Sequence, residues 1–229
     1  MTTDQVVVGI RSGVKPTNLF APDTSTGISE HPCAAELRQW TREHLCRPHP
    51  NLGRPGPVCP YIGQAISREF LWAAYFDGRH VDAERITAIA DDLYDLFPVL
   101  PPVTEPDSVF KAVLAVFPDL TDYSDLDAVQ NDQKTRFVEK GLMIGQFYPG
   151  CTVAGLRNPA FPALNAPLPM LAVRHMAPTD FLFLNTRHEW IDTYLKIFAP
   201  DIPGFIASTM SDRLVQTPDV PSGTPSAPN

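Results

Sequence analysis

The hydrophobic positions of this chain follow two different spacings, and each spacing predicts one kind of element. Apolar residues three or four positions apart indicate helices within residues 34–45, 82–97, 126–141 and 186–198. Short runs rich in aliphatic and aromatic residues indicate strands. The expected strands span residues 70–76, 109–117, 142–148, 170–176 and 181–184.

Local signals define the ends of two of these helices. Asp82 is placed to cap the helix that follows it, and Pro98 stops that helix because proline disfavours helical backbone at the residue before it. Thr186 and Glu189 have the spacing of a capping box, which predicts the start of the last helix.

The order of the elements predicts an α+β fold in a single domain, with helices packed on a mixed or mainly antiparallel sheet. The strands at 170–176 and 181–184 are separated by a short turn and are expected to pair as a hairpin. We expect residues 1–30 to be a weakly structured N-terminal segment and residues 31–200 to form the catalytic domain. The polar, proline-rich tail 217–229 is expected to be disordered.

Composition and charge narrow the range of partners. The 229 residues are 44% hydrophobic, enough for a substantial core, and carry a formal net charge of −8. An acidic chain is a poor match for nucleic acid or an anionic membrane surface and a better match for a cationic ligand. The sequence contains no apolar run as long as a membrane span and no secretory signal, so we expect a cytoplasmic protein.

The cysteines lack the spacing of a structural zinc site, since no C-x-x-C pair is present. In a reducing cytosol they are expected to be free thiols. They are Cys33, Cys46, Cys59 and Cys151.

The segment from His49 to Pro60 combines stiff backbone with chemically active side chains. It contains four prolines and two glycines, and it carries an imidazole (His49), a guanidinium (Arg54) and a thiol (Cys59). A stiff segment loses little further entropy when it is ordered against a ligand, which favours a binding loop. The alternative is a proline-rich connector with a buried cysteine that behaves as a small hydrophobic residue.

His175 is the most unusual of the six histidines because it lies in an apolar strand, on the same pleat face as Leu171 and Val173. A buried imidazole needs a partner for each nitrogen, and a metal ion can be one of them. The alternative is a core histidine bonded to backbone carbonyls. Arg174 follows the opposite face of a regular strand. His49 is the second candidate metal ligand.

Cys59 is the third candidate, because thiolates ligate heme iron. Gln146 and Tyr148 alternate on one strand face and are candidate pocket residues, with a solvent-facing polar edge as the alternative. His31 and His44 flank the first predicted helix and are expected at the surface. No string typical of a known catalytic class is present, so no catalytic residue is assigned.

Three segments, at residues 54–60, 141–149 and 169–176, resemble a group of actinobacterial proteins. Within that group the resemblance is strongest to heme-dependent arginine hydroxylases of D-cycloserine biosynthesis. It extends more loosely to the YqcI/YcgG-type family, which includes heme enzymes that N-hydroxylate guanidino groups. The resemblance runs from about residue 31 to residue 198.

This resemblance implies a heme b cofactor and O₂-dependent hydroxylation of L-arginine, or a related guanidino compound, to its N-hydroxy form. An external electron donor is then required, and a homodimer is one option for the assembly. The local reasoning above makes His175 the first candidate for the iron ligand. The same reasoning leaves His49, Arg54, Cys59, Gln146, Tyr148 and Arg174 as candidates for contact with the cofactor.

Two other function classes stay open at the level of sequence. One is a thiol-dependent enzyme in which Cys59 is the nucleophile and Arg54 the activating cation. The other is a ligand-binding domain without catalytic activity.

Overall fold

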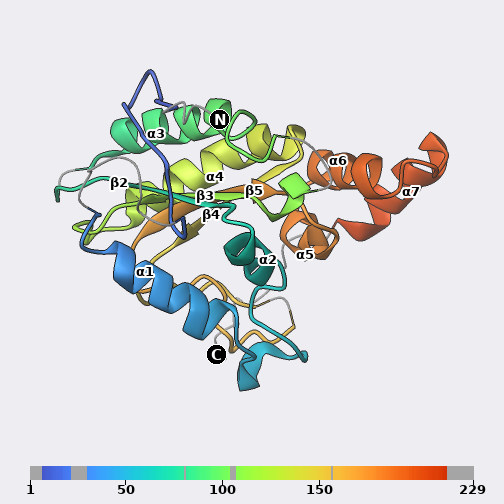
Figure 1. Ribbon diagram of the computed structural model, residues 1–229. Coiled ribbons are helices and arrows are strands. Elements are labelled where there is room, and N and C mark those ends of the chain that lie inside the picture. Colours follow the sequence, from blue (N-terminus) through green and yellow to red (C-terminus); the bar gives the residue numbers. More distant parts are fainter. Residues whose placement is uncertain (1–6, 22–29, 80, 104–106, 156, 216–229) are drawn as a thin grey trace, which may run out of the picture. The chain divides into compact units, whose positions relative to one another are not determined.

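The computed structural model describes residues 7–21, 30–79, 81–103, 107–155 and 157–215 (Figure 1). The chain divides into two compact units, Met1–Ala177 and Pro178–Asn229. The first unit contains a five-stranded mixed sheet with helices packed on it. The predicted α+β class is confirmed.

The sheet has the order β1-β2-β3-β5-β4 in the part of the chain that the structure describes. β2 and β3 are parallel, and the other neighbouring strands are antiparallel. The expected strand at 109–117 begins later, because residues 107–110 form the short 3-10 helix η3. The strands are β1 (Thr17–Asn18), β2 (Leu71–Tyr75), β3 (Ala112–Val116), β4 (Leu142–Phe147) and β5 (Met170–His175).

Two crossover connections place both long helices on one face of the sheet. α3 (Ala83–Leu96) connects β2 to β3, and α4 (Ser124–Glu139) connects β3 to β4. β3 and β4 run in the same direction because each is antiparallel to β5, which lies between them. Right-handed crossovers that advance in one direction across a sheet keep their helices on the same side. Figure 1 shows α3 and α4 together on that side.

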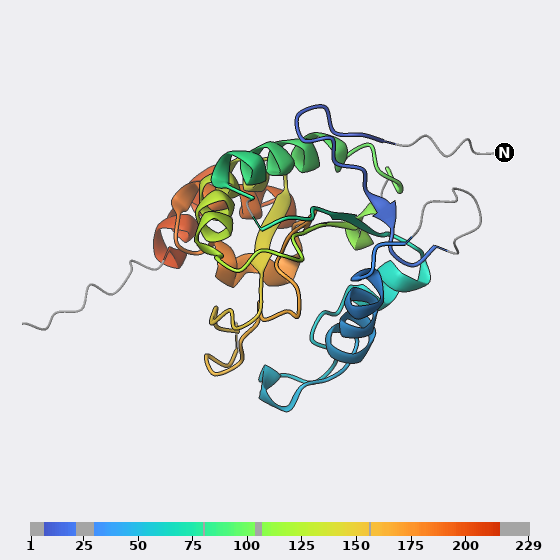
Figure 2. The same ribbon diagram turned by 90° about the vertical axis from the view of Figure 1, so that its left-hand side faces the viewer.

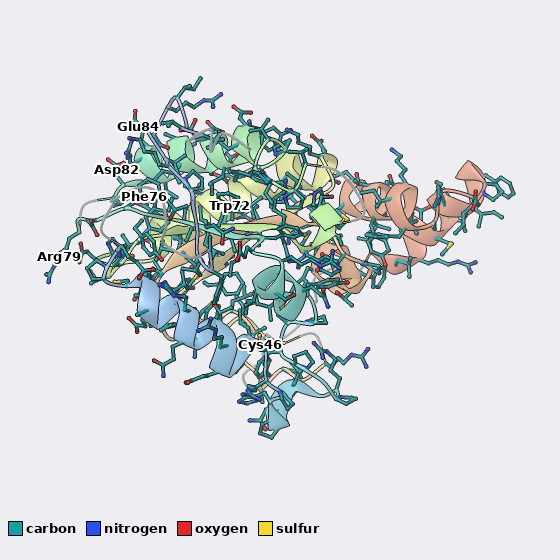
Figure 3. All side chains as sticks on the ribbon, in the orientation of Figure 1. Cys46, Trp72, Phe76, Arg79, Asp82 and Glu84 are labelled. Atoms are coloured by element: carbon teal, nitrogen blue, oxygen red, sulfur yellow. The ribbon has the colours of Figure 1, made fainter. Side chains whose placement is uncertain are left out.

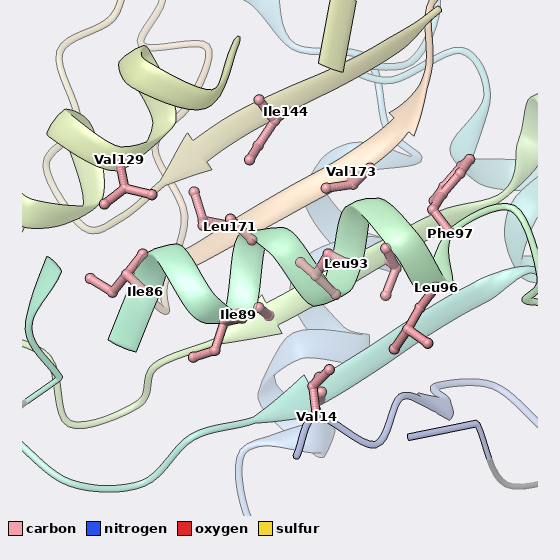
Figure 4. Close-up of a cluster of buried hydrophobic side chains, with 14 of the residues drawn as sticks. Val14, Ile86, Ile89, Leu93, Leu96, Phe97, Val129, Ile144, Leu171 and Val173 are labelled. Carbon is pink, nitrogen blue, oxygen red and sulfur yellow. The ribbon is translucent and has the colours of Figure 1, made fainter. Parts of the chain in front are cut away.

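α3 packs a row of aliphatic side chains against this face of the sheet (Figure 4). Ile86, Ile89 and Leu93 are fully buried and pack in one cluster with Leu171 and Val173 of β5. Burial of each such side chain stabilises the fold by about 1.5–3 kcal/mol.

The predicted cap of α3 is confirmed. The Asp82 carboxylate accepts a hydrogen bond of 2.9 Å from the backbone N–H of Arg85. This bond satisfies one of the amide groups that the first helical turn leaves without a partner.

The opposite face of the sheet is covered by α1 (Ala34–Trp40), the π-helical turn η1 (Thr41–Leu45) and α2 (Ile62–Ser67). Leu37 and Ile62 pack there in one cluster with Leu114 and Met170. We call this the loop face, because two proline-rich loops, residues 46–60 and 148–169, also lie on it (Figure 2).

The expected hairpin between residues 170–176 and 181–184 is wrong. Both edges of β5 are occupied, by β3 on one side and β4 on the other. Residues Phe181–Leu184 form the short helix α5, which follows the 3-10 turn η4 (Pro178–Asp180). A strand with two partners leaves no edge for a third.

The second unit continues with α6 (His188–Phe198) and α7 (Gly204–Leu214). The predicted capping box is wrong, because the N-cap of α6 is Arg187 and no side chain caps it. The sequence did not predict α7. Within the described residues, no helix is both long and apolar enough to cross a bilayer.

Residues 7–21 contribute more to the first unit than their weak periodicity predicts. Val14 and Leu19 are buried in the two core clusters. The Asp92 carboxylate holds this segment against α3. It accepts hydrogen bonds from the backbone amides of Arg11 and Ser12 and a hydrogen bond of 2.7 Å from the Ser12 hydroxyl. The expected disordered tail and residues 1–6 and 22–29 lie outside the described residues.

We expect Asp92→Asn to lower the free energy of unfolding by about 2 kcal/mol, because the amide cannot accept all of these bonds. Burial raises the pKa of Asp92, but the hydrogen bonds from Ser12 and Arg11 outweigh burial and lower it overall. This stabilisation is therefore present above the unfolded-state pKa, about 4, and is lost as the pH falls through the folded-state value.

Urea unfolding at several pH values measures both effects. The control Asp95→Asn removes a half-exposed partner of Arg11 and should cost less than about 0.5 kcal/mol; equal losses in the two variants would contradict the assignment.

Candidate functional site

The two proline-rich loops meet on the loop face although about a hundred residues separate them in sequence. The Asn158 side chain donates a 2.8 Å hydrogen bond to the carbonyl of Asn51. Gly53 has a φ of 75°, and a Cβ at this position would lie 3.0 Å from Arg157. The contact is close enough to favour glycine there, both for its backbone conformation and for its lack of a side chain.

The first loop is held by its own hydrogen bonds. Pro48 and Pro57 face each other in an isolated antiparallel bridge, and the Val58 amide donates to the Arg47 carbonyl at 2.9 Å. The Arg54 guanidinium donates to the carbonyls of Pro55 and Val58. Arg54 therefore stabilises the conformation of the loop through hydrogen bonds to its own backbone.

A cluster of flat side chains joins η1 and both loops. The ring of His44 lies nearly parallel to that of Trp40, with centroids 6.2 Å apart, and to that of Phe161, at 6.5 Å. Phe147, at the end of β4, meets Trp40 edge-on at 6.3 Å. His49 completes the group, 5.0 Å from Phe161 and 6.0 Å from His44. We call these five residues the aromatic cluster.

The imidazole of His44 is half-buried in this cluster. Burial, first, and the neighbouring His49, second, lower the pKa of His44 below its ordinary value of 6.5. The ring is therefore neutral at physiological pH and retains a lone pair that can bind a metal ion.

His49 is oriented differently. Its Nδ1 accepts a hydrogen bond of 3.2 Å from the backbone N–H of Asn51, two residues later. A neutral imidazole that accepts through Nδ1 carries its proton on Nε2. Neither nitrogen of His49 then offers a free lone pair to a metal ion. Its ring contributes only packing to the cluster.

His175 lies on the other face of the sheet. As predicted, it follows the same pleat face as Leu171 and Val173, and its ring packs edge-on against Phe97, 5.1 Å away, where α3 ends. Arg174 follows the opposite face and donates a 2.9 Å hydrogen bond to the carbonyl of His175.

Gln146 and Tyr148 also follow the face covered by α3 and α4. The Tyr148 hydroxyl donates to the Asp127 carboxylate of α4 at 2.9 Å, and its ring stacks on Tyr123. Burial and this hydrogen bond raise the pKa of Tyr148 well above its ordinary value. Tyr148 thus links β4 to α4.

The predicted site residues therefore divide between two faces of the sheet. His49, Arg54 and Cys59 come together in the first loop, and Cys59 packs against the core cluster of the loop face. Arg174 follows the loop face with Met170 and Ala172, whereas Gln146, Tyr148 and His175 follow the opposite face, so one ligand bound on the loop face cannot contact all seven.

Sequence reasoning missed the members of the cluster that lie outside the first loop. His44 was expected at the surface but is half-buried. A signal was present, because His44 follows Trp40 by four residues and shares its side of a helix. Phe147 and Phe161 had no comparable signal, since tertiary contacts alone bring them to His44.

Comparison with known proteins places the chain in a family. The model of the domain of unknown function DUF6875 matches residues 34–209, so the chain belongs to that family. The match spans most of both compact units. No curated protein and no solved structure matches the chain.

We expect the ring protons of His44 to titrate with a midpoint below 6.5 in an NMR pH series. Because folding lowers this pKa, protonation opposes the folded state, and stability should decrease as the pH falls from about 6.5 toward the midpoint. His49→Asn keeps an acceptor for the Asn51 amide but removes the neighbouring imidazole that contributes to the lowered pKa of His44. The midpoint of His44 should then rise and stay below 6.5, because burial is the larger cause. A midpoint at or above 6.5 in the wild type would show that the ring is solvated.

Proposed function

We propose that this protein is a heme-dependent oxygenase that hydroxylates a guanidino nitrogen of L-arginine or a related compound, with its cofactor on the loop face. The observation that carries the proposal is the neutral, half-buried imidazole of His44 among the flat side chains of the aromatic cluster. The resemblance of three sequence segments to heme enzymes that N-hydroxylate guanidino groups supports the same reaction class.

The residues present fit a heme in their chemistry. Within the described residues, no group of three or more His, Cys, Asp or Glu side chains could hold a bare metal ion. A heme makes no such demand, because the porphyrin supplies four nitrogen ligands and one donor from the chain is enough. His44 is that donor in our proposal, in place of His175.

The other residues on this face would hold and shield the cofactor. Trp40 and Phe147 are half-buried and would offer apolar ring surface that excludes water from a bound macrocycle, and the buried ring of Phe161 supports His44 from behind. Arg47 and Arg157 are exposed at the two loops, where their guanidinium groups can pair with propionate carboxylates. A bound heme supplies O₂ activation with electrons from an external donor.

The charge of the chain suits the proposed substrate. A net charge of −8 attracts a guanidinium cation, and a carboxylate can hold that cation through two parallel hydrogen bonds. The protein's part is then to orient the guanidino group beside the cofactor and to keep bulk water away.

The test is hemin binding followed by optical spectroscopy of the full chain. We expect the purified wild type to bind hemin with a sharp Soret band, and His44→Ala to lose or strongly shift that band because it removes the nitrogen that would hold the iron. His175→Ala is the matched control, an imidazole on the opposite face, and should keep the wild-type spectrum.

Each other outcome has a definite meaning. Loss of the band in His175→Ala alone would move the ligand to the face covered by α3 and α4. A wild type that takes up no hemin would reject the proposal. With hemin bound, incubation with L-arginine, O₂ and a reductant should give N-hydroxy-L-arginine by mass spectrometry. Binding without turnover would indicate a heme-binding domain without this activity.

A further inference from the structure

Cys46 and Cys59 lie close together where the first loop begins and ends. The bridge between Pro48 and Pro57 and the bond from the Val58 amide to the Arg47 carbonyl join the two arms of the loop in an antiparallel arrangement. Next to Arg47 the pairing shifts by one residue, because Cys46 has helical backbone (φ −79°, ψ −6°). The Cys59 amide donates to the Leu45 carbonyl at 3.0 Å, so Cys59 faces Leu45 and lies beside Cys46.

This proximity suits a disulfide bond. Directly opposite residues of an antiparallel pair have Cα atoms about 4.5–5.5 Å apart, and a residue next to such a pair, as Cys46 is to Leu45, stays near the range of about 4.4–6.8 Å found across disulfides. Both cysteines are half-buried free thiols that pack against the core of the loop face. The influence of Cys59 on the pKa of Cys46 reflects the same proximity.

Cys46 also lines a surface pocket. Figure 3 labels Cys46, which lies where the helical segment of α1 and η1 meets the first loop. The pocket is a shallow depression of about 360 Å³ that is largely open to solvent. Arg42 and Arg47 line it together with Cys46 and with Gly63 and Ile66 of α2. Two guanidinium groups beside a thiol favour a small ligand that carries carboxylates.

We propose that Cys46 and Cys59 are a redox-active dithiol that forms a reversible disulfide, with a low-molecular-weight anionic disulfide such as oxidised glutathione as the oxidant. The Cys46 thiolate attacks one sulfur of the oxidant and releases one thiol as a mixed disulfide forms. Cys59 then attacks the sulfur of Cys46 and releases the second thiol. Two electrons and two protons pass from the cysteines to the oxidant, which leaves as two thiols.

Neither bond formation nor its detection requires heme, so the inference stands apart from the function proposed above. The sequence makes the test direct. Arg47 and Arg54 are each followed by proline, which blocks tryptic cleavage, so both cysteines stay in the peptide 43–68. An internal disulfide then appears as the loss of two hydrogen atoms from this one peptide under non-reducing conditions.

We expect the reduced full-length protein, treated with oxidised glutathione, to show this loss and to recover on reduction. Cys59→Ser should stop at a glutathione adduct on Cys46, and Cys46→Ser should form no internal disulfide. Cys33→Ser is the matched control and should behave as the wild type. The proposal would be overturned by a wild-type peptide that keeps both thiols in a large excess of oxidised glutathione. A disulfide that involves Cys33 or Cys151 instead would also overturn it.

Discussion

The placement of α3 and α4 on one side of the sheet is the constraint on which the rest of this structure depends. β2, β3 and β4 run in one direction and are joined by helical crossovers, so both helices must lie on the same face. Their aliphatic side chains pack against that face and form the larger core cluster. The other face is left to the N-terminal helices and the two loops, where His44, Cys46 and Cys59 lie partly exposed.

Proline-rich loops suit this task because they are ordered with few backbone hydrogen bonds. Their fixed dihedrals reduce the entropy lost on folding, and the first loop needs only a short bridge and the internal bonds of Arg54 to hold its shape. The second loop adds Phe161, which is almost fully buried against the histidines. The same backbone thus holds an imidazole cluster on one part of its surface and a pair of thiols on another.

Local patterns predicted most of the elements but not their partners. The stripe of Ile86, Ile89 and Leu93 identified α3, and the Asp82 cap followed from the residue type alone. The strand at 181–184 failed because a short apolar run fits a buried helical turn as well as a strand, and only the pairing of β5 distinguishes them. The capping box failed for a related reason, since α6 begins two residues after Thr186.

In the candidate site, too, the sequence predicted local relations between residues, and the tertiary structure decided their contacts. The chain by itself determined that His49, Arg54 and Cys59 share one stiff segment, because neighbours in a rigid loop cannot separate. It also determined the opposite orientations of Arg174 and His175, because side chains alternate along a strand. Only the tertiary structure decided that His175 faces α3 and that His44 lies among rings from two distant loops. Which face of a sheet a residue reaches, and what covers it there, depends on strand order and crossover direction, and these arise from contacts between segments far apart in the sequence.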